Sequence, residues 1–249
     1  MGNLTYLITG ANRGLGRQFV MDLLGRPDTT VLATVRDPGS DTARSLGDLT
    51  AAQGSRLHVL RVDDKISEVG YGTIPARLGQ MGVTQVDVAI ANAGYTDVYN
   101  TMRATDPEEV RCCFEVNAVG PLKLLQACWP LLQQAGGGKF VLMTSVMGSK
   151  GSLDEKYWPG LAYGMSKAAA NLMAKKVSIE CRDAGLLVGI IEPGWSRTSM
   201  GQAFGDFVGE EPPLSVEESS RRVLQQIDKL SFATTHGKFI NNQGQELPW

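Results

Sequence analysis

The feature that most constrains the fold is a glycine-rich segment, TGANRGLG at 9–16, which lies between an apolar run and a helical one. Glycines at this spacing permit a tight strand-to-helix turn and let the N-terminus of the helix approach a pyrophosphate. The segment therefore predicts a strand–turn–helix unit that binds a dinucleotide; an ordinary turn of the same shape is the alternative. The cofactor contacts predicted here are Gly10, Asn12, Arg13, Gly14, Leu15 and Gly16.

Apolar, β-branched runs alternate with helical segments along the rest of the chain, which is typical of βαβ units and a parallel sheet. VDVAIA at 86–91 and FVLM at 140–143 are apolar almost throughout, as expected of strands buried on both faces. The predicted strands are 5–9, 30–35, 56–61, 86–91, 139–144, 187–191 and 238–240. The predicted helices are 14–25, 40–53, 65–80, 107–134, 160–183 and 215–229.

The chain is expected to form one domain over residues 1–249, because no repeat, low-complexity block or linker divides it. Two helix starts are well marked: Asp106 precedes a proline, and Ser215 stands three residues before Glu218 in a capping box. The longest stretch predicted to be irregular is 195–213, rich in glycine and proline, and we expect it to be a substrate lid.

Charge and composition exclude several kinds of partner and site. The 24 basic and 26 acidic residues leave a net charge of −2, which does not indicate binding to nucleic acid or to a membrane surface. No run approaches the roughly 20 apolar residues of a membrane-spanning helix, and residues 1–10 predict a strand, not a signal peptide. The expected location is cytoplasmic. Neither the four cysteines nor the two histidines have metal-ligand spacing, so we expect reduced, packed thiols and no metal site.

The end of the second predicted strand indicates which nicotinamide cofactor is preferred. An acidic residue there would hold the 2′-hydroxyl of NAD, whereas arginine suits the 2′-phosphate of NADP. Arg36 occupies this place, and Arg13 in the glycine turn can approach the same phosphate. Asp37 follows, with its side chain expected to point away. Two converging arginines favour NADP(H); a solvated surface pair is the alternative.

Tyr163 and Lys167 are four residues apart, so they share one face of a predicted helix. A phenol of ordinary pKa, near 10, is a poor acid or base at neutral pH, and a nearby cation would lower that pKa. The pair therefore predicts acid–base chemistry on an alcohol or carbonyl. A tyrosine and lysine at this spacing are by themselves most often a solvated helix face, and it is the glycine turn upstream that favours the catalytic interpretation.

Two further polar residues are candidates for the same site. Ser145 ends the fifth predicted strand at the edge where open α/β sheets bind ligands, so its hydroxyl could hold a substrate oxygen beside Tyr163. Asn117 lies four residues before Pro121, which has no N–H to donate to the Asn117 carbonyl. We expect a bend there and a carbonyl available to a water on a proton route toward Lys167. A strand-end cap and an ordinary helix kink are the alternatives.

Together these residues resemble the short-chain dehydrogenase/reductase family. The motifs run in the family's order from residue 9 to residue 198: the glycine turn, Asn92-Ala93-Gly94, Asn117, Ser145, Tyr163-x(3)-Lys167 and Pro193-Gly194-Trp195-x(2)-Thr198. The resemblance implies an α/β fold, a Rossmann-like, doubly wound, seven-stranded parallel sheet flanked by helices. It implies NADP(H) as cofactor and a catalytic tetrad of Asn117, Ser145, Tyr163 and Lys167. It further implies cofactor contacts from Tyr163, Lys167, Asp63, Asn92, Ala93, Gly94, Pro193, Gly194, Trp195 and Thr198, with Asp63 near the adenine and Thr198 near the carboxamide.

Finer resemblances point to a branch of the family. The ending from Gly237 to Trp249 is similar to C-factor and sniffer-like carbonyl reductases, and YGMSKAAAN at 163–171 is similar to fungal norsolorinic acid ketoreductase-type enzymes. Two departures stand out. Ala91 replaces a frequent asparagine, and the gap from Ser145 to Tyr163 is long, so residues 151–159, with Tyr157 and Trp158, are expected to form a loop beside the pocket.

The expected activity is NADPH-dependent reduction of a ketone or aldehyde, reversible as alcohol oxidation. Imine reduction, a cyclisation with NADPH as template and a non-catalytic NADP(H)-sensing module are the alternatives. Helices 107–134 and 160–183 are those through which the family commonly forms homodimers or homotetramers. Aromatic residues on segments expected near the pocket favour a bulky, polyketide-like substrate of secondary metabolism, or else are ordinary packing: Tyr95, Tyr99, Trp158, Trp195, Phe204 and Phe207.

Overall fold

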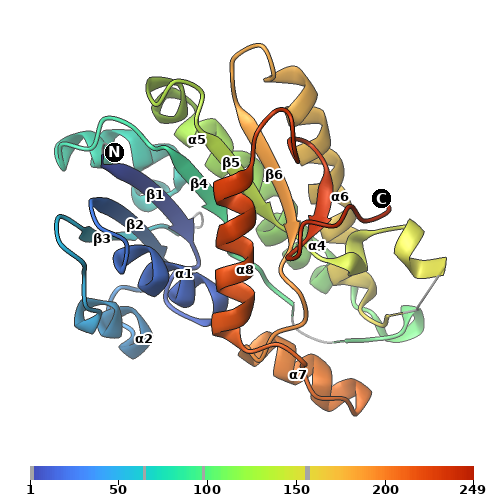
Figure 1. Ribbon diagram of the computed structural model, residues 1–249. Coiled ribbons are helices and arrows are strands. Elements are labelled where there is room, and N and C mark those ends of the chain that lie inside the picture. The colour runs from blue at the N-terminus through green and yellow to red at the C-terminus, as the bar shows by residue number, and fades with distance from the viewer. Residues whose placement is uncertain (1–2, 64–65, 97–98, 155–157) are drawn as a thin grey trace. The chain divides into compact units, whose positions relative to one another are not determined.

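A seven-stranded sheet is the framework of the computed structural model, which describes residues 3–63, 66–96, 99–154 and 158–249 (Figure 1). The strand order is β3-β2-β1-β4-β5-β6-β7, and the pairings β1–β2, β1–β4, β2–β3 and β6–β7 are parallel. This order reverses direction after β1, as expected of a doubly wound fold, so the predicted fold class is confirmed. The strands are β1 Leu4–Thr9, β2 Thr29–Val35, β3 Arg56–Arg61, β4 Val88–Ala91, β5 Lys139–Met143, β6 Leu187–Glu192 and β7 Phe239–Asn241.

Most of the predicted helices are present. Asp106 caps α4 by accepting from the backbone N–H of Glu108 at 2.9 Å, and Ser215 caps α8 by accepting from that of Glu218 at 3.1 Å. Both caps confirm the sequence prediction. The helices are α1 Gly14–Leu24, α2 Asp41–Arg44, α3 Ile74–Gln80, α4 Pro107–Phe114, α5 Gly120–Gln134, α6 Leu161–Glu180, α7 Ser199–Val208 and α8 Val216–Lys229.

Three predicted segments differ from the structure. The helix predicted over 40–53 is only α2 followed by a 3₁₀ turn, Ser45–Asp48, because a glycine and an aspartate disfavour further α-helix. The helix predicted over 65–80 begins at Ile74, after two glycine-punctuated 3₁₀ turns, and its residue 65 lies outside the described residues. The stretch 195–213 is not irregular throughout, because it contains α7.

The chain divides into two compact units, and the first comprises residues up to 93, 123–141 and 181–187. Its strand β2 is buried at every residue, as expected of a central parallel strand with both faces covered. Helix α1 presents Phe19, Val20, Leu23 and Leu24 to the core, and all four are fully buried or nearly so. At about 25 cal/mol per Å² of apolar surface removed from water, such side chains dominate the stability of the unit.

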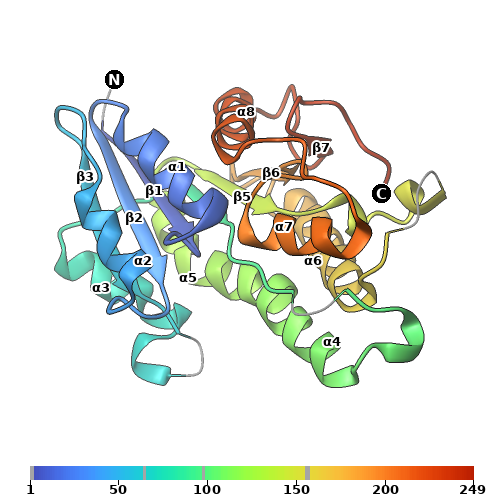
Figure 2. The ribbon, with the colours of Figure 1, turned by 90° about the horizontal axis from the view of Figure 1, so that it is seen from below.

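The second unit comprises residues 94–122, 142–180 and 188–249. In it, α4 and α6 pack against each other, and both are visible in Figure 2. The chain between α4 and α5 is a π-helical turn, Glu115–Val119, that interrupts the long helix predicted over 107–134. Helix α8 is amphipathic and buries Val223, Leu224 and Ile227.

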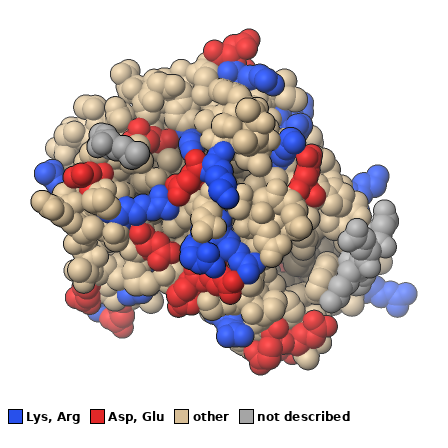
Figure 3. Space-filling view, in the orientation of Figure 1, with Lys and Arg blue, Asp and Glu red and all other residues tan. Residues whose placement is uncertain are grey.

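The distribution of charge on the surface and the hydropathy of the helices are as expected from the composition. Figure 3 shows basic and acidic side chains interspersed over the face it draws. Within the described part of the chain, no helix combines the length and the apolar character needed to cross a bilayer. None of the four cysteines, all of which lie in the described residues, forms a disulfide; Cys113 and Cys128 are buried, as expected of packed thiols, whereas Cys112 is exposed.

Candidate active site

The glycine turn at 10–16 has a geometry that larger residues could not adopt. Gly10 has φ +64°, in the left-handed region. A Cβ on Gly16 would lie 2.2 Å from the carbonyl oxygen of Gly10 and 2.6 Å from Nδ2 of Asn92. The backbone therefore closes on itself at this turn, as a phosphate-binding turn requires. The helix it opens, α1, has no acidic side chain in its first turn and no side-chain bond from its N-cap residue, Arg13. Its positive end thus remains available to an anion.

Asn92 and Ala93 hold this turn from the end of β4. The amide of Asn92 donates to the carbonyl of Thr9 at 2.9 Å, and the backbone N–H groups of Asn92 and Ala93 both donate to the Thr9 hydroxyl at 3.0 Å. The sequence-predicted residues of β1, the glycine turn and β4 are therefore in direct contact. Asp63, predicted near the adenine, follows β3 and is half-buried.

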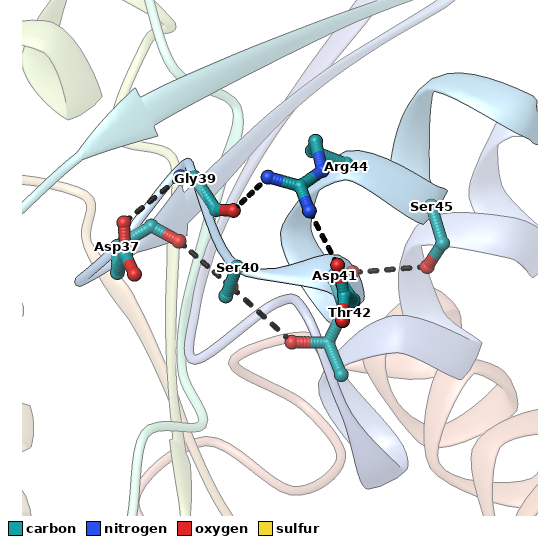
Figure 4. Close-up of polar contacts among 7 residues, drawn as sticks. All are labelled: Asp37, Gly39, Ser40, Asp41, Thr42, Arg44 and Ser45. Carbon is teal, nitrogen blue, oxygen red and sulfur yellow. Dashed lines mark hydrogen bonds and ion pairs between the residues drawn. The ribbon is translucent and has the colours of Figure 1, made fainter.

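The loop after β2 carries the residues predicted to select the cofactor. Arg36 is exposed at the end of β2, as is Arg13 in the glycine turn. Asp37 uses its carboxylate within its own turn, accepting from the backbone N–H of Gly39 at 2.9 Å (Figure 4). Its side chain therefore caps the loop.

The same loop is tied to the glycine turn and stiffened by its own side chains. Asn12 donates to the Thr42 hydroxyl at 2.7 Å. Arg44 donates to the Gly39 carbonyl and pairs with Asp41 (Figure 4). Ion pairs this exposed add little stability, but they give the loop a defined shape beside Arg36.

Tyr163 and Lys167 lie on one face of α6, as their spacing predicts. The Lys167 ammonium is 5.5 Å from the centroid of the Tyr163 ring and donates to the carbonyl of Met143, at the end of β5, at 3.0 Å. Lys167 is only 4% exposed, and burial lowers its pKa to about 8. Its ammonium charge is thus held deep in the unit by one backbone carbonyl and one aromatic face.

The prediction that Lys167 holds the pKa of Tyr163 down is wrong for this structure. Burial is the largest effect and raises the pKa of Tyr163 above its ordinary range, and the nearby Tyr99 and Glu192 raise it further. A hydrogen bond with Ser145 acts in the opposite direction but is outweighed. The physical reason is that desolvation disfavours the phenolate more than the neighbours stabilise it. Tyr163 is therefore a protonated phenol at neutral pH, which suits it to donate a proton.

Asn117 sits inside the π-helical turn, fully buried. Its side chain accepts from the backbone N–H of Tyr95 at 2.8 Å and donates to the carbonyl of the same residue at 2.8 Å. It also donates to the Ser166 hydroxyl at 2.9 Å, which in turn donates to the Tyr163 carbonyl at 2.7 Å. Pro121 lacks the N–H that would close the next α-helical bond, and the chain here takes a wider turn rather than a simple kink.

Ser145 follows β5 and turns the chain toward a 3₁₀ segment, Val146–Gly148. Its hydroxyl accepts from the backbone N–H of Met147 at 3.2 Å. The loop is anchored on α6, since the Thr144 hydroxyl donates to the Asn171 amide oxygen at 2.5 Å. Ser145, Tyr163, Lys167 and Asn117 all belong to the second unit, which brings this predicted tetrad together.

The turn after β6 contains the remaining predicted residues. Gly194 has φ +83°, and its N–H donates to the Glu192 carboxylate at 2.8 Å. The indole of Trp195 donates to the Gly201 carbonyl at 2.9 Å, and the Thr198 hydroxyl caps α7 by accepting from the Gly201 N–H at 3.0 Å. These contacts connect the turn to the start of α7.

Glu192 is the residue of this site that the sequence analysis missed. Burial raises its pKa to about 7, against the lowering effect of the Gly194 N–H. A carboxyl group next to the Pro-Gly pair was the only sequence signal, and its burial could not be read from the strand pattern.

Five of the six aromatic residues singled out in the sequence form one cluster centred on Phe204. The ring centroid of Phe204 lies 4.7 Å from that of Tyr99, 5.3 Å from that of Trp195 and 5.6 Å from that of Trp158. Phe207 adjoins Tyr99 at 6.2 Å. Tyr99, one member of this cluster, raises the pKa of Tyr163. Tyr95 contributes its backbone to Asn117 instead, and Tyr157 lies outside the described residues.

The predicted site residues thus form two groups, each assembled within its own unit. The first unit carries the glycine turn, Arg36, Asp63, Asn92 and Ala93. The second carries Gly94, the tetrad and the Pro193–Thr198 turn.

Comparison with known proteins gives one consistent family. Residues 5–208 match the short chain dehydrogenase family. Norsolorinic acid ketoreductase nor1 of Dothistroma septosporum is 32% identical over 250 residues, covering 98% of this chain and 92% of the relative. Among solved structures, the NADPH-bound carbonyl reductase from chicken fatty liver is 27% identical with a TM-score of 0.86, covering 100% of both chains. Carbonyl reductase Sniffer of Drosophila melanogaster is 28% identical with a TM-score of 0.85, also covering 100% of both chains.

Proposed function

The chain belongs to the short-chain dehydrogenase family, and we propose that it is an NADPH-dependent reductase of a bulky ketone or aldehyde. The observation that carries the proposal is the half-buried, protonated Tyr163 phenol, one helical turn from Lys167 and near enough to Ser145 for that hydroxyl to act on its pKa. A neutral phenol beside a hydroxyl that can hold an oxygen is an acid positioned for a carbonyl.

NADP(H) fits the residues of the first unit. The closed glycine turn suits the pyrophosphate, because a Cβ on Gly16 would collide with Gly10 and Asn92, so glycine is needed for the turn to close at the N-terminus of α1. Arg13 and Arg36 would hold the 2′-phosphate, and the carboxylate of Asp37 is engaged in its own turn. NADPH supplies a hydride when bound.

The chain's own residues would handle the substrate oxygen and its proton. Ser145 would hold the oxygen, and Tyr163 would give it the phenolic proton. The resulting phenolate would be stabilised by the Lys167 ammonium, which balances the charge as the proton leaves. Asn117 fixes the Tyr163 end of α6 through Ser166, and its carbonyl would hold a water that returns a proton toward Lys167.

The aromatic cluster around Phe204 supports a bulky, flat substrate. Aromatic rings pack against aromatic ligands with a gain of about 0.5–1.5 kcal/mol per pair beyond burial of area. The Dothistroma septosporum relative is named a norsolorinic acid ketoreductase, which supports a ketone as the substrate. We propose that this ketone is bulky, polyketide-like and part of secondary metabolism. We include in the proposal that the whole chain acts as one domain in the cytoplasm and that 195–213, including α7, covers the substrate.

A substrate screen tests this proposal. We expect the purified protein to oxidise NADPH with multi-ring aryl ketones about tenfold or more faster, in kcat/KM, than with small aliphatic ketones of equal reactivity. Loss of NADPH absorbance measures the rate, and the alcohol product is identified by mass spectrometry. Turnover of imines alone would favour the imine reductase alternative. Product formed without NADPH consumption would favour a templated cyclisation, and tight NADPH binding with no turnover on any substrate would favour a sensing module.

We also propose that the protein forms a homodimer or homotetramer through α4 and α6. The outer face of α6 exposes Leu161, Met165, Leu172 and Ile179, and the last two are 60% and 69% exposed. Phe114 at the end of α4 is also exposed. An exposed apolar stripe of this kind marks an interaction surface. Light scattering should give a multiple of 26.8 kDa, and Leu172→Glu with Ile179→Glu should reduce it to the monomer mass. A monomeric wild type would contradict the proposal.

A further inference from the structure

One backbone carbonyl in the second unit receives two buried side-chain donors. The carbonyl of Pro193 accepts from the Ser219 hydroxyl at 2.7 Å and from the Asn242 amide at 2.7 Å. Ser219 lies on α8 and is fully buried, and Asn242 follows β7 and is 5% exposed. The two donors therefore come from elements 26 and 49 residues further along the chain.

The other side of the same peptide group is also held. The N–H of Gly194 donates to Glu192, so the Pro193–Gly194 peptide has both its oxygen and its N–H engaged by side chains. A Cβ on Gly194 would lie 2.5 Å from the Asn242 amide nitrogen, which shows that Asn242 packs directly against the turn. The carbonyl of Asn242 in turn accepts from the Gln226 amide of α8 at 3.2 Å. Three hydrogen bonds to side chains thus fix the plane of the Pro193–Gly194 peptide: two at the Pro193 carbonyl, from Ser219 and Asn242, and one from the Gly194 N–H to Glu192.

Buried polar side chains carry a cost that their hydrogen bonds must offset. Removing a hydroxyl or an amide from water without a hydrogen-bond partner destabilises the folded protein. Ser219 faces the interior on the same helix as Val223 and Ile227, where an apolar residue would pack without that cost. Ser219 and Asn242 are therefore better explained by their hydrogen bonds to the Pro193 carbonyl than by the packing of α8.

We propose that Ser219 and Asn242 are positioning residues that jointly set the orientation of the Pro193–Gly194 peptide and so of the cofactor-facing turn through Thr198. The inference rests on the proposed function, since it takes this turn to contact the nicotinamide end of NADP(H). Ser219 and Asn242 do not themselves touch the cofactor. Their effect is to keep the turn in its binding conformation before the cofactor arrives, which reduces the entropy lost on binding.

The two donors should act as a pair. A carbonyl oxygen has two lone pairs, so losing one donor leaves the carbonyl satisfied by the other. Losing both leaves a buried carbonyl with neither side-chain partner, and the turn would then reorient to reach another donor. The loss in affinity from the double variant should therefore exceed the product of the single losses.

The test compares Ser219→Ala, Asn242→Leu, the double variant and the control Ser178→Ala. Ser178 is a buried serine of α6 whose hydroxyl donates to a carbonyl of its own helix, that of Lys175, at 2.7 Å. Isothermal titration with NADP⁺ gives Kd, steady-state kinetics give KM and kcat, and thermal melting reports stability. We expect Kd to rise about threefold in each single variant and about 100-fold or more in the double variant, well above the product of the single losses. The control should keep its Kd within about twofold even though its melting temperature falls.

The outcomes separate this inference from the proposed function. If the wild type does not bind NADP⁺, the proposed function fails. If the wild type binds and the double variant loses no more than the singles predict, the joint positioning role is refuted. Where the double variant does not fold, hydrogen exchange in the peptide covering 193–198 decides. Faster exchange in the folded Ser219→Ala protein than in Ser178→Ala supports the inference, and equal exchange overturns it.

Discussion

Replacing Tyr163 with phenylalanine is expected to reduce kcat by about 10²–10⁴-fold while the Kd for NADPH changes by less than about threefold. The change removes one oxygen, the proton donor of the proposed reaction, and leaves the ring under the Lys167 ammonium. Single-turnover rates with saturating NADPH measure the chemical step, and NADPH fluorescence measures binding. A slower single-turnover rate with unchanged NADPH binding indicates loss of the proton donor, whereas weaker NADPH binding indicates damage to the cofactor site.

A matched control comes from a buried tyrosine that is not among the predicted site residues. Tyr6 lies on β1 in the first unit and is 3% exposed. Tyr6→Phe should leave kcat within about twofold of the wild type. Turnover retained in Tyr163→Phe would remove Tyr163 from the role of proton donor, and a comparable loss in Tyr6→Phe would indicate a general effect on folding.

Replacing Arg36 with alanine is expected to lower the preference for NADPH over NADH, expressed as the ratio of kcat/KM values, by about 10- to 100-fold. Each arginine–phosphate interaction is a charge-assisted hydrogen bond of about 1.5–3 kcal/mol, and NADH lacks the phosphate. Arg13→Ala should act in the same direction, and the double variant should approach equal use of the two cofactors. Rates with NADH should change little in any of them.

Arg44 provides the control for charge, because it lies on the same exposed loop but is already paired with Asp41 and with the Gly39 carbonyl (Figure 4). Arg44→Ala removes one positive charge from the neighbourhood and should leave the cofactor ratio within about twofold. An unchanged ratio in Arg36→Ala would exclude Arg36 from the 2′-phosphate site. Equal effects in Arg36→Ala and Arg44→Ala would point to long-range charge instead of direct contact.

Sequence patterns predicted correctly the turns and helix caps whose geometry depends only on residues close together in the chain. The TGANRGLG segment indicated a glycine turn because the φ of Gly10 and the close approach at Gly16 are properties of neighbouring backbone atoms. The Asp106 and Ser215 caps were predictable for the same reason. The helix expected over 40–53 is shorter in the structure because Gly47 and Asp48 disfavour α-helix, a local signal that the apolar pattern did not outweigh.

The sequence by itself determined the fold class, the family resemblance and the shared helix face of Tyr163 and Lys167, because periodicity and spacing encode them. Only the tertiary structure decided the pKa values of those residues and the hydrogen bonds that hold the site. Burial, which no spacing reveals, raises the pKa of Tyr163 and lowers that of Lys167. The bonds from Asn117 to Tyr95 and from Ser219 and Asn242 to Pro193 join segments 22 to 49 residues apart. Such contacts depend on how the whole chain packs, and a local pattern carries no record of them.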